Sequence, residues 1–480
     1  MTEERRGGGF AVRGGVTDAR VVAAEVCADL RGGELLDPSF ERRASVLDAR
    51  DRRWTQELIY GMLRRRAWID ALLSERVRGG LARLDSDLTD LLRLGTYQLL
   101  YMGSVPAYAA IAQTVELAKR RHGIGASKLA NAVLRRIDRE RNAIALEPTP
   151  VSRPGTSAVS GAPGTTGGSS GSGGPAMPGV QGDPVDALSL AYSHPRWLVA
   201  RWVGRWGAEE TERLLVANNA EGPLIVRPFG IVAEQLEATL ESAGIRVEEA
   251  PLVRDSIQLP AGVSLAELGA FRQGLFFVQD PASTLVVKYA AVPAGAAAAD
   301  LCAAPGGKSL ELSRTAAVVY TADRSFARLQ RMLGNMRRLE TRNIYPLVAD
   351  AREPAVRPVD AVLVDVPCTG TGTFRRHPDA RWRLRISDLA VMAALQRAIV
   401  RAAAAVVAPG GLLIYSTCSL EPEENDAQVE SFLAEHPEWR LEPPPEGAVP
   451  AQVLDAGRLR VLPQRHGVDG AFAARLRRVA

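Results

Sequence analysis

Two cysteines follow apolar segments and have the residue type best suited to covalent catalysis. Cys368 ends the stretch Asp-Val-Pro-Cys after the apolar segment 360–366, and Cys418 lies in Ser-Thr-Cys-Ser after the apolar segment 410–415. A single buried cysteine is most often a small hydrophobic residue. Both segments, however, are predicted to be parallel strands, whose carboxyl edge places thiols beside backbone amides and basic groups that favour a thiolate. The pair therefore predicts thiolate chemistry.

A thiolate beside an alkyl donor suits attack on a ring carbon that is itself a poor nucleophile. C5 of a pyrimidine is such a carbon, because thiolate addition at C6 turns C5 into an enamine-like nucleophile that can accept a methyl group from a sulfonium. After the transfer, the C5 proton must leave and the thiolate must be expelled, and a second thiol or a base can assist that release. The two cysteines thus indicate pyrimidine methylation.

The alkyl donor requires a binding turn, and residues 300–309 provide a candidate: Asp-Leu-Cys-Ala-Ala-Pro-Gly-Gly-Lys-Ser. An apolar run of small residues precedes this stretch and a periodic segment follows it, which predicts a strand, a tight turn and a helix. Gly306 and Gly307 permit positive φ and let a ligand approach the main chain, toward which the helix points its first amides. Such a turn is the usual nucleotide pocket of a parallel α/β sheet.

Two ligand classes fit this turn. Gly307, Lys308 and Ser309 match the end of a phosphate-binding P-loop, but that pattern requires a glycine where the chain has Cys302. Pro305 also removes an amide from the phosphate cradle. A nucleoside triphosphatase is therefore disfavoured.

Acidic residues at the ends of the next predicted strands favour an adenosyl ligand. Segment 318–322 ends at Asp323, which is well placed to accept hydrogen bonds from ribose hydroxyls. A third apolar segment ends at Asp350, and a fourth carries Asp365. Carboxylates at one sheet edge suit a ligand with hydroxyls, an amine and a cationic centre, and they would repel a triphosphate.

Length and composition limit the classes of protein to which the chain can belong. The chain of 480 residues is long enough for several domains, and its net charge of +4 with local basic clusters favours an anionic partner. Its four cysteines are far apart and without metal-ligand spacing, so neither a disulfide framework nor a metal site is expected. The N-terminus has no apolar core typical of a secretory signal, and no apolar stretch could span a bilayer. We expect a cytoplasmic protein.

Five segments differ in composition. Residues 1–15 are charged and glycine-rich and are expected to be disordered, and 16–145 carry helical periodicity and basic clusters suited to phosphate contact. Residues 146–185, rich in Gly, Ser and Pro, are expected to form a flexible linker. Short strand and helix signals in 186–280 predict a small α+β subdomain for RNA recognition, and 281–480 carry the α/β pattern of the catalytic domain.

A basic segment follows Cys368. A pyrimidine must be unstacked before a thiolate can reach C6, and a single-stranded RNA loop costs less to open than a duplex. Side chains that could hold phosphates beside the opened base are Arg375, Arg376, His377 and Arg381. The alternative interpretation of this run is a solvated loop after a strand.

Four segments together resemble a known family. Residues 300–308, 365–372, 375–379 and 416–425 are similar to the signature segments of S-adenosylmethionine-dependent RNA cytosine-5 methyltransferases. The helical front end resembles a NusB-like domain, as in the RsmB (Fmu/Sun) branch that modifies small-subunit ribosomal RNA. The resemblance implies an all-α NusB-like bundle, then a small α+β subdomain and an α/β Rossmann-like methyltransferase domain.

The resemblance also implies roles. Cys418 would attack C6 and Cys368 would assist release of the methylated RNA, whereas DNA cytosine-5 methyltransferases use the Pro-Cys cysteine as nucleophile. Asp323 would hold the ribose, Asp350 would lie near the adenine, and Asp365 near the methionine amine or the target base. Lys308 and Asp365 could also polarise the cytosine ring. The residues expected to wrap S-adenosylmethionine are Cys302, Ala303, Ala304, Pro305, Gly306, Gly307 and Lys308.

Alternatives remain open at this point. The same chemistry could act on transfer RNA or at another ribosomal position. The front end alone also fits a non-enzymatic NusB-like RNA-binding factor, although such a factor has no need of paired thiols at a cofactor edge. The favoured interpretation is a monomeric enzyme that acts on 16S ribosomal RNA, without a metal or a membrane partner.

Overall fold

The computed structural model describes residues 12–13, 16–144 and 183–479. The expected disordered N-terminus, 1–15, and the expected linker, 146–185, lie almost wholly outside these residues. The described residues form two compact units: those up to Asn219 together with His377–Trp382, and Ala220–Arg376 together with those from Arg383 onward. This division groups residues 183–219 with the helical front end, so the expected boundary at residue 186 stays a prediction.

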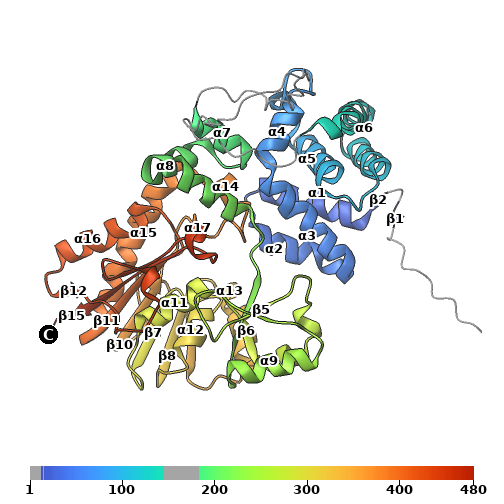
Figure 1. Ribbon diagram of the computed structural model, residues 1–480. Coiled ribbons are helices and arrows are strands. Elements are labelled where there is room, and N and C mark those ends of the chain that lie inside the picture. Colours follow the sequence, from blue (N-terminus) through green and yellow to red (C-terminus); the bar gives the residue numbers. More distant parts are fainter. Residues whose placement is uncertain (1–11, 14–15, 145–182, 480) are drawn as a thin grey trace, which may run out of the picture. The chain divides into compact units, whose positions relative to one another are not determined.

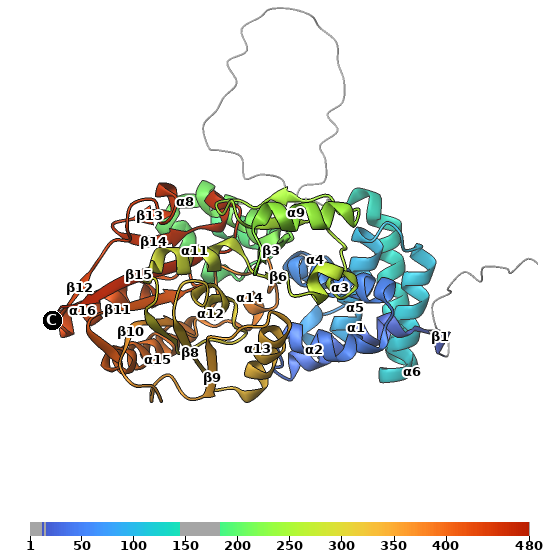
Figure 2. The ribbon, with the colours of Figure 1, turned by 90° about the horizontal axis from the view of Figure 1, so that it is seen from below.

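The first unit is helical (Figure 2). Two short strands, β1 and β2, pair at its start. Helices α3 and α5 begin where Asp48 and Asp85 accept hydrogen bonds from amides of the first turn. Helix α5 packs against α1, α3, α4 and α6, which makes it the centre of the core. The elements are β1 Val12–Arg13, β2 Val16–Thr17, α1 Asp18–Arg31, α2 Leu36–Arg43, α3 Ala49–Arg64, α4 Arg66–Ser74, α5 Ser86–Tyr101, α6 Ala107–Glu140, α7 Pro184–Ala191 and α8 Arg196–Asn219.

The second unit begins with a small antiparallel sheet in the order β4-β5-β3-β6. Helix α9 packs on this sheet through Leu236 and Leu240, which are buried with Val226 and Phe276 of the strands. The elements are β3 Leu224–Pro228, α9 Ala233–Ser242, β4 Glu248–Glu249, β5 Ile257–Leu259, α10 Gly269–Arg272 and β6 Phe276–Val278.

The large sheet of the second unit has the order β13-β14-β15-β11-β10-β7-β8-β9, with β12 also paired to β15. Strands β9, β8, β7, β10 and β11 are parallel, and β15 runs antiparallel beside β11 and β14. The strands are β7 Ala297–Asp300, β8 Val318–Asp323, β9 Ile344–Val348, β10 Val359–Asp365, β11 Val407–Thr417, β12 Trp439–Leu441, β13 Leu454–Asp455, β14 Arg458–Val461 and β15 Ala471–Arg478.

Helices cover both faces of this sheet (Figure 1). Ala361 and Leu363 of β10 belong to the core shared with α11, α12 and α13, whereas Val362 and Val364 belong to the core shared with α15 and α16. This alternation is the strand period of two, with both faces buried. The helices of the second unit are α11 Pro281–Ala290, α12 Gly307–Leu312, α13 Phe326–Arg338, α15 Ile386–Ala405, α16 Asp426–Glu435 and α17 Pro463–His466. Helix α14, Ala380–Arg383, belongs to the first unit through its residues 380–382.

The architecture confirms the predicted fold class: a helical bundle, a small α+β subdomain and an α/β domain with a mostly parallel sheet. Strands β14 and β15 pair as an antiparallel hairpin. Within the described ranges, no helix combines the length and the apolar character needed to cross a bilayer.

Candidate active site

The glycine turn, residues 301–308, connects β7 to α12. Gly306 has φ +108°, and a Cβ there would lie 2.7 Å from Cγ of Met332, so both the backbone conformation and the close packing require glycine. A Cβ on Gly307 would lie 3.2 Å from Nε2 of Gln279. The tight turn expected from the sequence is therefore present, and its shape depends on helix α13 and on the end of β6.

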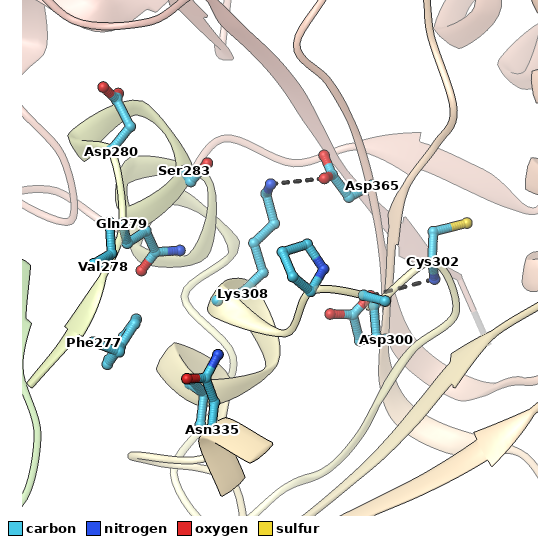
Figure 3. Close-up of a pocket in the computed structure, with 15 residues that line it drawn as sticks. Phe277, Val278, Gln279, Asp280, Ser283, Asp300, Cys302, Lys308, Asn335 and Asp365 are labelled. Carbon is cyan, nitrogen blue, oxygen red and sulfur yellow. Dashed lines mark hydrogen bonds and ion pairs between the residues drawn. The ribbon is translucent and has the colours of Figure 1, made fainter. Parts of the chain in front are cut away.

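A pocket opens against this turn (Figure 3). The predicted residues Cys302 to Pro305, Gly307, Lys308 and Asp365 line it. The opposite wall comes from the end of β6 and the start of α11, and no sequence pattern had pointed to these residues. They are Phe277, Val278, Gln279, Asp280 and Ser283, joined by Asn335 of α13.

Lys308 and Asp365 form the central ion pair of the pocket. Nζ of Lys308 lies 2.7 Å from Oδ2 of Asp365, and the Ser416 hydroxyl donates to Oδ1 of Asp365 at 2.8 Å. Figure 3 shows Lys308 reaching across the pocket toward Asp365, while the Cys302 sulfur points away from this pair. Burial alone would lower the pKa of Lys308, but the Asp365 carboxylate outweighs it and raises that pKa. Lys308 is therefore a cation.

The other acidic residues lie in different environments. Asp323 is buried at the end of β8, where it accepts hydrogen bonds from the amides of Ala304 (3.3 Å) and Ser325 (2.9 Å). Asp350 follows β9 and is paired with Arg352, whose side-chain and backbone hydrogen bonds lower the pKa of Asp350 to about 2. Asp323 touches the glycine turn directly, whereas Asp350 is not among the residues that line the pocket.

Asp300 is the most buried carboxyl beneath the turn. The Ser309 hydroxyl donates to it at 2.7 Å, and the Cys302 amide donates at 3.4 Å. Burial raises the pKa of Asp300 to about 6 despite the hydrogen bond from Ser309. Burial, followed by the negative charge of Asp300, also raises the pKa of Cys302, so this thiol stays protonated and is no nucleophile.

The two predicted catalytic cysteines meet. Sγ of Cys368 lies 3.2 Å from Sγ of Cys418, although the residues are fifty positions apart in the chain. The hydrogen bond to Cys418 raises the pKa of Cys368 well above its usual value, and burial and the charges of Cys418, Glu424 and Asp365 add to this effect. Cys368 therefore keeps its proton at pH values where an ordinary cysteine begins to lose it.

Close backbone packing joins the cysteine turns, which are residues 367–372 and 418–425. The Gly372 amide donates to the Cys418 carbonyl at 3.0 Å, and the Gly370 backbone has φ +68° close to the Cys418 sulfur. Glu424 is fully buried between the two turns, and Asn425 accepts from Thr417 at 2.6 Å. The resemblance included the Glu-Glu-Asn segment, but nothing in the sequence assigned these side chains to the cysteines.

The basic segment after Cys368 is bound within the protein. Arg375 and Arg376 share the carboxylates of Asp280 and Asp469, and Arg375 is buried. The remaining two residues of the segment belong to the first unit, where His377 lies 3.0 Å from Asp37.

Arg381 is fully buried and donates to Asn219 at 2.7 Å. Burial, followed by the charge of Arg64, lowers the pKa of Arg381 to about 9. Direct phosphate contact would require Arg375 and Arg381 to leave their internal partners. Phosphate binding by Arg375, Arg376, His377 and Arg381 stays a prediction.

The side chains of this site suit a ligand that carries an adenosyl group and a sulfonium. The carboxylates can accept hydrogen bonds from the hydroxyl and amine groups of such a ligand. The two thiols follow the ends of strands of the same sheet. Within the described residues, no cluster of three or more His, Cys, Asp or Glu could hold a metal ion.

Comparison with protein families gives matches along most of the chain. The profile "16S rRNA methyltransferase RsmB/F" matches residues 292–477, and the NusB family matches 17–139. A ferredoxin-like domain of RsmF/B-like methyltransferases matches 194–266.

Two similar proteins align with nearly the whole length of this chain. A probable ribosomal RNA small subunit methyltransferase B from Synechocystis is 32% identical, with 96% of this chain and 99% of that protein covered. The ribosomal RNA small subunit methyltransferase B of Pseudomonas syringae is 31% identical, with coverage of 96% and 97%.

Solved structures agree with this likeness. PH0851 is 25% identical with a TM-score of 0.74, covering 97% of this chain and 99% of its own. A methyltransferase homologue from Pyrococcus horikoshii is 27% identical with a TM-score of 0.53, covering 62% of this chain and 99% of its own.

Proposed function

The chain belongs to the RsmB/F family of 16S rRNA methyltransferases, and from that premise we propose that it methylates C5 of a cytosine in small-subunit ribosomal RNA with S-adenosylmethionine as donor. The observation that carries the proposal is the contact of 3.2 Å between the sulfurs of Cys368 and Cys418, which follow the ends of the neighbouring strands β10 and β11. A thiol pair at this place has a use in cytosine methylation and none in a binding factor.

Cys418 is the proposed nucleophile. Its thiolate forms a bond from Sγ to C6 of the target cytosine, and the electrons of the C5–C6 double bond move toward C5 and the ring. Lys308, held by Asp365, lies close enough to Cys418 for their charges to interact, so it can stabilise the negative charge at both the sulfur and the ring. When bound, S-adenosylmethionine would supply an electrophilic methyl group: the electron pair at C5 would form the bond to the methyl carbon, the S–CH3 bond would break, and S-adenosylhomocysteine would leave as a neutral thioether.

Cys368 is assigned to the release step. Once Cys418 is a neutral thioether, the negative charge that held a proton on Cys368 is gone, so Cys368 can lose that proton to solvent. The resulting thiolate then accepts the C5 proton. The electron pair of the C5–H bond restores the C5–C6 double bond, and Cys418 departs as a thiolate.

The glycine turn and the acidic residues are the proposed cofactor site. Cys302 to Lys308 would surround the donor, Asp323 would accept hydrogen bonds from the ribose, and Asp350 would lie near the adenine. Asp365 lies on the cysteine side of the pocket, where it can contact the methionine amine or the amino group of the target base. The carboxylate chemistry of the pocket supports an adenosyl sulfonium over a triphosphate.

The substrate is proposed from the family. The relatives are named as methyltransferases of small-subunit ribosomal RNA, so we propose this RNA for the chain. A cytoplasmic, monomeric enzyme is proposed from the sequence alone. Transfer RNA stays the second candidate, because none of the site residues selects one RNA over the other.

The test is methyl transfer from radiolabelled S-adenosylmethionine to small-subunit ribosomal RNA that lacks the modification. The intact protein is compared with Cys418→Ala and Cys368→Ala. We expect label in 5-methylcytosine with the intact protein, none with Cys418→Ala, and a trapped covalent protein–RNA adduct with Cys368→Ala.

Other outcomes have definite meanings. Label in a transfer RNA pool alone would move the substrate and keep the chemistry. Label at a position other than C5, or transfer that survives Cys418→Ala, would overturn the proposed mechanism.

A further inference from the structure

Glu424 is a fully buried carboxylate that accepts four hydrogen bonds from uncharged donors. Oε1 accepts from the Thr369 amide at 2.9 Å and from Nε2 of Gln396 at 2.9 Å. Oε2 accepts from the hydroxyls of Thr369 and Ser419. Burying a carboxylate costs free energy of desolvation, and the four hydrogen bonds offset that cost.

The donors belong to the two turns that carry the thiols. Thr369 directly follows Cys368, and Ser419 directly follows Cys418. Gln396 of α15 also donates to the Pro367 carbonyl at 2.9 Å, which fixes the first turn to the helix. The hydrogen bonds to this one carboxylate therefore join the two cysteine turns.

We propose that Glu424 is a positioning residue that locks the two cysteine turns together, so that one sulfur can attack the base while the other holds a proton beside it. The inference rests on the proposed function for the roles of the cysteines. It adds a residue that sets the separation of the sulfurs and their division of labour without touching the RNA or the cofactor.

Charge supports the same assignment. The charged or titratable groups that face Cys368 are Cys418, Glu424, Asp365 and Tyr415, and Lys308 lies on the Cys418 side. The hydrogen bond with Cys418 and burial are the main causes of the raised pKa of Cys368, and the Glu424 carboxylate raises it further. Removing this carboxylate should therefore lower the pKa of Cys368.

Two variants separate charge from geometry. Glu424→Gln keeps the shape of the side chain, and the hydroxyls of Thr369 and Ser419 can turn to accept from its amide, so mainly the charge is lost. Ser419→Ala removes one of the hydrogen bonds and keeps the charge. Asp426→Asn is the matched control, because it neutralises a carboxylate two residues away whose partners are Arg458 and Arg460.

The first measurement needs no RNA. In full-length protein carrying Cys418→Ala, the rate of Cys368 alkylation by iodoacetamide is followed against pH, with each cysteine resolved by mass spectrometry. Glu424→Gln should increase this rate below the pKa of Cys368, by roughly three- to fourfold for each unit by which that pKa falls, because a thiolate of lower pKa is also a weaker nucleophile. Ser419→Ala and Asp426→Asn should leave the rate within about twofold, since neither removes the Glu424 charge.

The second measurement is methyl transfer with both cysteines present. Glu424→Gln should lower kcat about tenfold with an unchanged KM for S-adenosylmethionine, and it should shift the pH profile of adduct release to lower pH. Ser419→Ala should lower kcat a few fold without the pH shift, and Asp426→Asn should change neither. A thermal unfolding curve for each variant verifies that it is folded.

A failure of the proposed role of Glu424 can be distinguished from a failure of the proposed function. If alkylation and transfer by Glu424→Gln match the unaltered protein while Cys418→Ala abolishes transfer, the role of Glu424 is overturned and the chemistry stands. If Cys418→Ala retains transfer, the proposed function fails, and the alkylation result still decides whether Glu424 controls the Cys368 thiol.

Discussion

The glycine turn and the cysteine turns lie on the same sheet edge but are held in different ways. Backbone conformation shapes the glycine turn, with Gly306 at positive φ and Asp323, from the next strand, accepting the Ala304 amide. The cysteine turns are fifty residues apart in sequence, and buried side chains hold them together, above all Glu424.

This difference suggests a division between binding and chemistry. A cofactor site built from a local turn forms wherever strand, turn and helix form. A pair of thiols from separate strands depends on a buried polar network, in which every member must be satisfied. Substitutions at the cysteine turns should therefore alter kcat, and substitutions at the acidic residues of the cofactor site should alter the KM for S-adenosylmethionine.

Gly372→Ala should have the largest effect, because it separates the cysteine turns at their backbones. A Cβ at Gly372 would lie 2.7 Å from the Cys418 carbonyl oxygen and 2.7 Å from Cα of Gly470, so it would clash with the backbone of two segments. We expect a loss of stability of roughly 1–3 kcal/mol, measured by chemical denaturation. The rate of methyl transfer should fall by on the order of 10³-fold or more, because the reaction is very sensitive to displacement of the reacting groups.

Gly334→Ala is the control for that substitution. Gly334 lies in α13, and a Cβ there would meet nothing within 4 Å. Alanine should stabilise the helix by about 0.5–1 kcal/mol and leave transfer unchanged. Equal activity of the two variants would show that the backbone contact between the cysteine turns does not matter for the reaction.

Lys308→Met tests whether the pocket serves chemistry as well as binding. Methionine keeps most of the side-chain length but removes the charge beside Asp365 and Cys418. We expect kcat to fall by on the order of 10²–10³-fold, since the variant loses a preorganised cation where negative charge develops. Single-turnover methylation measures the effect, and a change confined to the KM for S-adenosylmethionine would make Lys308 a binding residue only.

The same comparison explains what could be predicted from the sequence. The glycine turn, the strand ends and the fold class followed from short patterns, because their causes lie within a few residues of each other. The meeting of Cys368 with Cys418 followed only from the parallel-sheet rule and the family resemblance. Glu424 and the wall from Phe277 to Ser283 were missed, because their importance arises from tertiary contacts that leave no periodic signal.

The basic segment shows the same limit. Arginines next to a catalytic motif predicted phosphate contact. A sequence does not show, however, which arginines form ion pairs with buried carboxylates in the folded protein. Arg375 is buried against Asp280 and Asp469, residues about ninety positions away on either side. Net charge alone therefore does not separate an RNA-binding arginine from one that stabilises the fold.

Asp300 should make stability depend on pH at the glycine turn. The folded-state pKa is raised to about 6, above the ordinary value of 3.8 for an aspartic acid, so its contribution is fully present below pH 4 and is lost as the pH rises through 6. The shift corresponds to roughly 3 kcal/mol. Unfolding of the ligand-free protein, measured from pH 4 to 7, should show this loss, and Asp300→Asn should remove it. Parallel curves for both proteins would contradict burial of an ionisable carboxyl here.

The smallest effect is expected at Asp350, at the outer end of the cofactor site. Its pKa of about 2 means that the carboxylate is charged throughout the working pH range, so any effect of its removal should not vary with pH. A half-exposed pair with Arg352 stabilises little, so Asp350→Asn should change unfolding by less than about 0.5 kcal/mol. If the carboxylate accepts hydrogen bonds from the adenosyl group, the KM for S-adenosylmethionine should rise about two- to fivefold with kcat unchanged.

Arg352→Ala decides what that increase means. This variant leaves the Asp350 carboxylate in place and removes the partner that orients it through hydrogen bonds of 2.7 and 3.0 Å. A smaller rise in KM than with Asp350→Asn would assign the effect to contact between Asp350 and the cofactor. Equal rises would mean that the pair acts only by shaping the segment after β9, and the cofactor site would then end at Asp323, whose contact with the Ala304 amide belongs to the glycine turn itself.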